Sequence, residues 1–160
     1  MKKTILTFLV IIFATHNIAE TIASCGPSEG QSYFPNLGQL IDKNTSGWQE
    51  DRIANGKVSV TLTDKEFDIM FIDILGDINS LKEQGANLSL QLIGGNSFSI
   101  QSTFRGETIE IYSFWRNNEG DLKYSLNQTK GELNLIPKSM LLLGDCSMIS
   151  FDWLKGYLTK

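Results

Sequence analysis

The side chains of this sequence that could do chemistry are carboxylates, cysteines and aromatic rings, because histidine is almost absent. The one histidine, His16, lies in the N-terminal segment. A folded domain without imidazole lacks the usual general base of hydrolases and the commonest metal ligand. We therefore expect no Ser-His-Asp or Cys-His relay, no metal site and no cofactor.

The clearest candidates for acid–base catalysis are Asp68 and Asp73, which flank apolar positions that a strand would bury. Two carboxylates can share acid–base work or bind a metal ion. These two are five residues apart, so on a regular strand their side chains point to opposite faces and cannot act together. Glu107 and Glu110 also differ in parity, and neither pair predicts a catalytic site.

Two cysteines, Cys25 and Cys146, stand near the two ends of the chain. In an exported protein such a pair predicts a disulfide that encloses almost the whole domain. The segment Ile22-Ala23-Ser24-Cys25 also fits a bacterial lipoprotein signal, in which Cys25 would carry the lipid. A lipoprotein cysteine follows the apolar segment closely, whereas a polar stretch from Thr15 to Thr21 intervenes here. We predict the disulfide and keep a lipid anchor through Cys25 as the alternative.

The first residues predict export. Two lysines precede an apolar run from Ile5 to Ala14, which is shorter than the roughly 20 residues of a transmembrane span. Small residues favour cleavage after Ala23, with Ala19 as a weaker alternative. We therefore predict a signal peptide over residues 1–23 and a single domain over residues 24–160, periplasmic or secreted in a bacterium. A membrane-anchored lipoprotein is the alternative location.

The charge of the chain argues against polyanionic partners. The net charge is −4, and loss of the signal peptide removes two lysines and one glutamate, which makes the domain one unit more negative. Lysine and arginine form no cluster. We therefore expect no binding to nucleic acid or to anionic membrane surfaces.

From Val58 onward, apolar and polar residues alternate in short runs separated by turn residues. Such alternation is typical of antiparallel strands with one buried face. The connections, such as a two-residue hairpin turn predicted at Arg105-Gly106, are too short for a crossover helix. We predict an all-β fold, an antiparallel meander of about eight strands in a closed or nearly closed barrel. A two-sheet sandwich is the alternative.

Several segments depart from this alternation. Phe67–Leu75 and Ser139–Leu143 are apolar on both faces, so we expect another element to cover them. The C-terminal segment, residues 151–158, places Trp153 on an apolar side if it is helical, and predicts a short element packed on the barrel. Gly26–Gly30 resembles no strand, and we expect an irregular lead-in there.

Aromatic residues mark a candidate binding surface. On the strand Thr108–Trp115, Tyr112 and Phe114 share one face and Trp115 lies on the other. Inward-facing rings could line a pocket for a small apolar ligand or fill the core of a small barrel, and we predict a filled core. An outward-facing set would be available to a partner protein. The candidate ligand or partner surface comprises Trp48, Tyr112, Phe114 and Trp115.

The chain resembles a group of small exported bacterial proteins. The resemblance rests on Cys25-Gly26-Pro27-Ser28-Glu29-Gly30, Tyr33-Phe34-Pro35, Gly47–Ile53, Phe114-Trp115, Thr129-Lys130 and Gly144-Asp145-Cys146. It implies export and a cysteine at each end of the domain, and it implies no activity. A lipocalin would carry Gly-x-Trp near its first strand, whereas Gly47 and Trp48 are adjacent here. Lipocalins are therefore an analogy of shape only.

Together these patterns predict a small exported protein of β-barrel shape that binds a partner protein or a small apolar ligand without catalysis. The alternative is a carboxylate-dependent enzyme such as a glycan-active hydrolase. Such an enzyme would hold two carboxylates about 5 to 9.5 Å apart in an open cleft.

Overall fold

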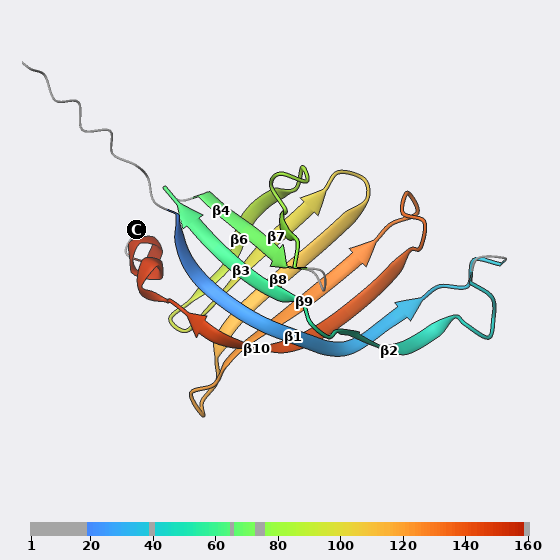
Figure 1. Ribbon diagram of the computed structural model, residues 1–160, viewed down its shortest axis with the longest axis horizontal. Helices are drawn as coiled ribbons and strands as arrows, with labels where there is room; N and C mark the ends of the chain where they lie inside the picture. Colours follow the sequence, from blue (N-terminus) through green and yellow to red (C-terminus); the bar gives the residue numbers. More distant parts are fainter. Residues whose placement is uncertain (1–18, 39–40, 65, 73–75, 159–160) are drawn as a thin grey trace, which may run out of the picture.

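The chain forms one antiparallel β-sheet that curls strongly into a half-barrel (Figure 1). The computed structural model describes residues 19–38, 41–64, 66–72 and 76–158. The strands are β1 (Glu20–Phe34), β2 (Gly47–Ile53), β3 (Lys57–Thr63), β4 (Glu66–Ile72), β5 (Ile78–Ser80), β6 (Asn87–Gly94), β7 (Ser97–Phe104), β8 (Thr108–Arg116), β9 (Leu122–Lys130) and β10 (Lys138–Ile149). A 3-10 turn, η1 (Asp152–Leu154), and a single helical turn, α1 (Lys155–Leu158), follow them.

The strand order explains how the sheet curls. It runs β5-β4-β3-β1-β10-β9-β8-β7-β6, and β2 pairs with β1 beside this path. All paired strands are antiparallel. β1 therefore lies between β3 and β10 and joins the two halves of the sheet. The predicted all-β, antiparallel class is confirmed.

The predicted strand number and closure are wrong. The described residues form ten strands rather than about eight, because β1 and β2 lack the alternation that predicts the other strands. Within the described chain, no ladder joins the two edge strands β5 and β6, so the barrel is not closed. β5 has only 3 residues, too short an edge to pair along the 8 residues of β6. The alternative of a sandwich is also wrong, since all described strands belong to one sheet.

The irregular lead-in expected at Gly26–Gly30 is wrong, because these residues belong to β1. The strand is 15 residues long and pairs with β10, with register shifts between Ser24 and Cys25 and between Cys25 and Ser28. Pro27 lies in the second shift, where the ladder is already interrupted and its missing N–H costs no strand pairing. At Gly30 a Cβ atom would overlap the backbone oxygen of Leu141, so only glycine lets the two strands approach this closely.

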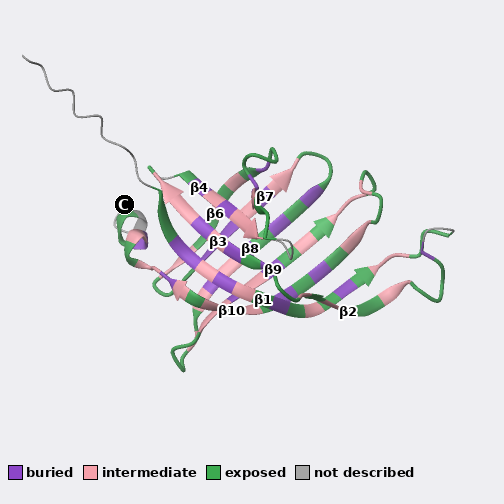
Figure 2. Ribbon diagram, in the orientation of Figure 1, coloured by how far each residue is buried: buried purple, intermediate pink, exposed green. Residues whose placement is uncertain are grey.

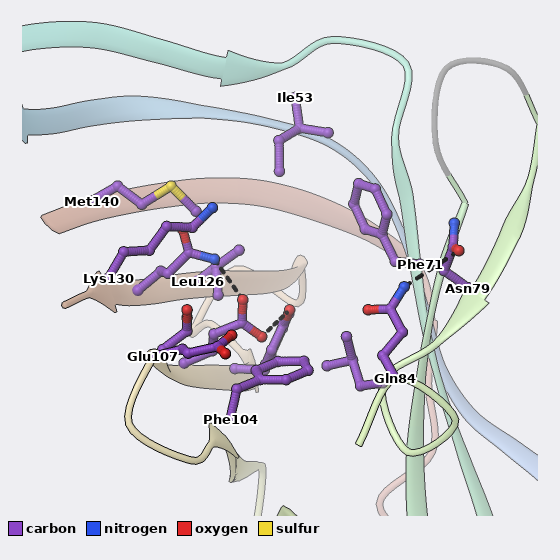
Figure 3. A pocket seen from close by; sticks show the side chains of 14 residues that line it. Ile53, Phe71, Asn79, Gln84, Phe104, Glu107, Leu126, Lys130 and Met140 are labelled. Atoms are coloured by element: carbon purple, nitrogen blue, oxygen red, sulfur yellow. Dashed lines mark hydrogen bonds between the residues drawn. The ribbon is translucent and has the colours of Figure 1, made fainter. Parts of the chain in front are cut away.

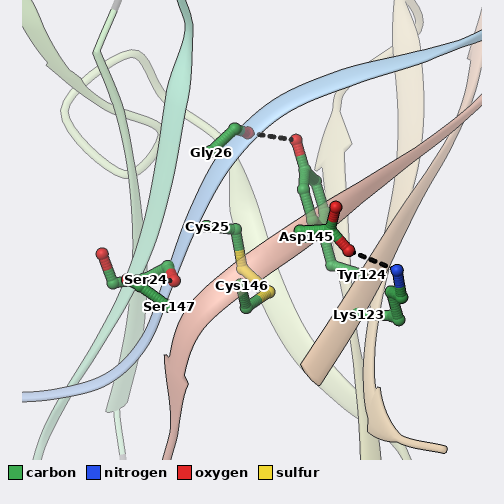
Figure 4. The surroundings of a disulfide bond; sticks show 8 residues. All are labelled: Ser24, Cys25, Gly26, Lys123, Tyr124, Asp145, Cys146 and Ser147. Atoms are coloured by element: carbon green, nitrogen blue, oxygen red, sulfur yellow. Dashed lines mark hydrogen bonds and ion pairs between the residues drawn. A yellow bond between two sulfur atoms is a disulfide. The ribbon is translucent and has the colours of Figure 1, made fainter. Parts of the chain in front are cut away.

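A disulfide ties β1 to β10, as predicted (Figure 4). Cys25 and Cys146 are Cα partners in the ladder, and their sulfur atoms are 2.00 Å apart across a sequence separation of 121 residues. In the chain-entropy model a loop of this length corresponds to about 5 kcal/mol of stabilisation. A sulfur bonded to Cys146 is not free to carry a lipid, so the disulfide argues against the alternative anchor through Cys25.

Aromatic rings fill one end of the half-barrel, which we call the filled end. Phe98 and Phe114 stack with ring centroids 4.9 Å apart, and Tyr124 stacks on Phe114 at 6.1 Å. Trp153 of η1 lies edge-on to Phe98 at 5.0 Å and to Phe67 at 5.3 Å. Because Phe67 belongs to β4 and Phe98 to β7, this one ring touches both halves of the open sheet.

Along most strands, buried residues alternate with exposed or half-buried ones (Figure 2). Leu141 and Leu143 of β10 are 44% and 53% exposed, so the expectation that another element covers both faces of Ser139–Leu143 is wrong. They face solvent because only the opposite face of β10 turns into the half-barrel. On β4, Phe67 and Ile69 are buried and the alternate residues are half-buried. The end of the predicted segment Phe67–Leu75 lies outside the described residues.

Candidate functional site

The end of the half-barrel opposite the aromatic rings, which we call the open end, contains a cavity of about 450 Å³ (Figure 3). Phe71 and Gln84 lie across the cavity from Phe104 and Leu126, so both halves of the sheet contribute to it. The predicted filled core therefore describes only the filled end. The lining residues are Ile53, Phe71, Asn79, Leu81, Gln84, Phe104, Glu107, Thr108, Glu110, Tyr112, Leu126, Gln128, Lys130 and Met140.

A buried carboxylate, Glu110 of β8, lines this cavity. Its side chain is on the inward face with Tyr112, and Glu110 is only 6% exposed. The Tyr112 hydroxyl donates a hydrogen bond of 3.0 Å to Glu110 Oε2, and Gln128 Nε2 donates to Oε1. Gln128 is the Cα partner of Glu110 on β9, so the strand register itself brings these two side chains together.

The hydrogen bonds to Glu110 come from neutral groups, and no cation neutralises it within the described chain. The four ion pairs found there are Lys82–Glu66, Lys123–Asp145, Lys138–Asp51 and Lys155–Asp152. On its other side, Glu110 has Ser102 of β7 as Cα partner, whose buried hydroxyl has no hydrogen-bond partner. Burying a charge without a counter-ion is costly, so the buried Glu110 is a candidate functional group.

Tyr112 is held in its neutral form by the same arrangement. Burial, and next to it the negative charge of Glu110, raise the pKa of Tyr112 well above its ordinary value of 10.0. The phenol therefore keeps its proton at neutral pH and donates a hydrogen bond to the carboxylate. Glu110 in turn is oriented by two donors from neighbouring positions of β8 and β9.

The walls and the mouth of the cavity differ in character. Leu81, Leu126 and Met140 are buried apolar walls. Gln84 and Glu107 are exposed at the mouth. The site is therefore an apolar chamber with one buried acid and a polar entrance, an arrangement that suits a ligand with an apolar body and a polar group.

The residues of the predicted ligand or partner surface are not brought together. Tyr112 and Phe114 are 3% and 0% exposed and face inward, so neither ring is accessible on the outer face of the sheet. Only Tyr112 lines the cavity. Trp115 is half-buried on the opposite face of β8. Trp48 is 67% exposed on β2, where its ring lies edge-on to Tyr33 at 5.4 Å.

The aspartates considered for catalysis do not form a site in the described chain. Asp68 accepts a 2.6 Å hydrogen bond from the Ser80 hydroxyl and a 3.3 Å bond from the backbone N–H of Lys82, and so holds the turn after β5. Asp73 lies outside the described residues. Within those residues, no group of three or more His, Cys, Asp or Glu side chains is placed to hold a metal ion.

Glu110 was not identified as a site residue from the sequence. Its spacing from Glu107 was considered only for whether the two side chains would point to the same face of a strand. The β7–β8 connection has three residues rather than two, since Phe104 pairs with Thr108. Glu107 therefore lies in the turn, where strand alternation does not apply, and both glutamates reach the same cavity. The signal available in the sequence was a glutamate on the same strand face as Tyr112 and Phe114.

Comparisons with protein families, with curated proteins and with solved structures find no match for this chain. No helix in the described part of the chain is long and apolar enough to cross a membrane. Any functional conclusion therefore rests on the geometry of the cavity.

Proposed function

We propose that the protein binds a small, largely apolar molecule in the cavity at the open end and does not catalyse a reaction. The observation that supports this is an apolar chamber of about 450 Å³ with a single buried acid in its wall. Ligand pockets typically measure roughly 300 to 1,000 Å³ and combine apolar walls with a few oriented polar groups. The outer face exposes the rings of Trp48 and Tyr33, but the hollow along the same two strands is lined by polar and charged side chains, namely Glu29, Gln31, Glu50, Asp51 and Arg52.

A glycan-active hydrolase is the second candidate, because Glu107 and Glu110 line one cavity. Binding is favoured for a physical reason. Both oxygens of Glu110 already accept hydrogen bonds from Tyr112 and Gln128, whereas glycoside hydrolysis uses an acid that must give its proton to the leaving group. Hydrolysis of nitrophenyl glycosides by the wild type, with loss of activity in Glu110→Gln, would replace the binding proposal by the enzyme.

A neutral fluorescent probe tests whether the cavity binds apolar molecules. We expect N-phenyl-1-naphthylamine to bind the full domain with a blue-shifted emission. Gln84→Trp places a large ring at the mouth without altering the buried walls, so it should weaken binding by at least about tenfold, or 1.4 kcal/mol. The matched control is Gln31→Trp, a substitution of the same kind at an exposed position of β1.

The two variants separate the cavity from the rest of the surface. Binding that is unchanged in Gln84→Trp, or weakened equally in Gln31→Trp, would show that the probe sits elsewhere. Absence of any probe binding by the folded wild type would contradict the proposed function itself. Circular dichroism of both variants checks that each remains folded.

We also infer that the chain is exported, and that its signal peptide ends at Ala19 rather than at Ala23. The disulfide supports an oxidising compartment. Ile22 and Ala23 are 0% exposed, and Ala23 pairs with Val60 on one side and Ile149 on the other. Cleavage after Ala23 would remove this buried start of β1, whereas cleavage after Ala19 leaves the whole strand in place.

The mass of the exported protein decides between the two cleavage sites. We expect a mature N-terminus at Glu20 with one disulfide. An N-terminus at Ser24 would show that the sheet forms without the first residues of β1. A diacylglyceryl adduct on Cys25 would replace both by the lipoprotein.

A further inference from the structure

The buried acid in the cavity bears on the charge of the ligand. An inference about that charge rests on the proposed function, the binding of a small apolar molecule. Glu110 is 6% exposed, so its side chain is separated from bulk water. Its two oxygens receive hydrogen bonds from a phenol and an amide, which orient a carboxylate without neutralising it. What the site lacks is a positive charge.

The lysines near the open end do not supply that charge. Lys138 pairs with Asp51 at 2.8 Å, where Asp51 also accepts a 2.6 Å hydrogen bond from Ser32. Lys130 lines the cavity, yet within the described chain Glu110 has no ion-pair partner within 4.0 Å. Glu107 adds a second negative charge at the mouth. The balance of charges around the chamber is therefore negative.

We propose that the ligand is an amphiphilic amine whose ammonium group pairs with Glu110 and whose apolar body lies against Leu126, Met140 and Phe104. An ammonium group carries only donors, and each carboxylate oxygen can accept more than the one hydrogen bond that it receives here. Pairing a buried carboxylate with a cation offsets its desolvation, whereas an alcohol adds only a neutral hydrogen bond. A carboxylate ligand would place two like charges side by side and is disfavoured.

Three probes with the same eight-carbon body test this choice by calorimetry at pH 7: octylammonium, 1-octanol and octanoate. We expect octylammonium to bind at least about tenfold more tightly than octanol, and octanoate to bind most weakly. Glu110→Gln keeps the size of the side chain and removes the charge. It should lower the affinity for octylammonium by about tenfold or more and leave the affinity for octanol within about twofold.

Glu119→Gln is the matched control, because Glu119 is exposed in the turn between β8 and β9 and its loss removes the same charge. It should leave the affinities for all three probes unchanged. The order of the three probes on the wild type needs no variant, so the proposal can be judged even if Glu110→Gln does not fold.

Two kinds of failure are distinguishable. If octanol or octanoate binds as tightly as octylammonium, or if Glu110→Gln leaves their ratio unchanged, the ammonium proposal is overturned and the apolar cavity remains. The same holds if N-phenyl-1-naphthylamine binds and none of the three probes does. If the naphthylamine and the three probes all fail to bind, the proposed function itself is overturned.

Discussion

The two ends of the half-barrel are built from the same strands and differ in what their inward faces carry. On β8 and β9, the filled end pairs Phe114 with Tyr124, and the open end pairs Glu110 with Gln128. At the filled end Trp153 also packs against the rings from outside the sheet. A change of residue type along a single strand pair thus separates a part that stabilises the fold from a part that can receive a ligand.

The two ends also differ in how their buried side chains affect the stability of the fold. At the filled end, Phe98 and Phe114 are almost fully buried. Burial of apolar surface is the main source of folding free energy. The open end contains a buried acid and the unpaired Ser102 hydroxyl, both of which oppose folding. Natural proteins retain such groups chiefly where they serve recognition or catalysis.

The largest expected effect is that of removing the disulfide, which lies toward the filled end of β1 and β10. Replacing both Cys25 and Cys146 by serine should lower the free energy of unfolding by about 5 kcal/mol, as measured by urea denaturation. While the variant is folded, its affinity for N-phenyl-1-naphthylamine should be unchanged, because the bridge is not part of the cavity wall. A parallel loss of binding would mean that the two ends are not separable.

The next effect compares one ring from each end. Phe98→Ala removes a 1% exposed ring that contacts Phe114 and Trp153, and should cost about 4 kcal/mol of stability. Phe104→Ala removes a half-buried ring of the cavity and should cost less than about half of that. The order reverses for probe binding, which Phe104→Ala should weaken and Phe98→Ala should not. Equal costs in denaturation would contradict the division into two ends.

The smallest effect concerns pH. Because the pKa of Tyr112 is raised by burial and by Glu110, the folded protein keeps this proton at a pH where the unfolded chain loses it. The stabilisation is complete below about pH 10, the ordinary tyrosine value, and declines as the pH rises above it. Tyr112→Phe should cost about 1 to 2 kcal/mol at pH 7 through the lost hydrogen bond, and should lose less stability between pH 10 and 12.

Tyr112→Phe should still lose some stability between pH 10 and 12, since burial raises the pKa of Tyr124 as well. Tyr33→Phe is the matched control, because Tyr33 is 42% exposed on the outer face. An identical alkaline decline in wild type, Tyr33→Phe and Tyr112→Phe would show that the phenol next to Glu110 does not carry the effect.

Local patterns in the sequence were sufficient for the strands that have one dry face. The alternation of β3 and of β7–β9 was predicted because the side-chain period of a strand is two wherever one face is buried. In β6 the prediction fails at Leu92, because a register shift after Leu90 leaves this side chain 67% exposed. The disulfide was predicted because the only two cysteines stand at opposite ends of the domain. β1 was not predicted, because Gly30 and Pro27 serve its close approach to β10 and its bulge, which are properties of the neighbouring strand.

The cavity could not be predicted because it depends on register between distant strands. Gln128 meets Glu110 only through the pairing of β8 with β9, and Phe71 faces Phe104 only because the sheet curls. The three-residue turn that places Glu107 at the mouth differs by one residue from the two-residue turn expected at Arg105-Gly106. A shift of one residue reverses the face of every side chain that follows.

The central claim, that the open end binds ligand and the filled end does not, is tested most directly by nuclear magnetic resonance. In a titration of ¹⁵N-labelled protein with octylammonium, the account predicts that the largest amide shifts fall at Glu110, Tyr112 and Gln128. The amides of Ile22 and Phe98 should remain in place. Shifts centred on Phe98 and Trp153, or on the outer-face rings of Tyr33 and Trp48, would contradict it.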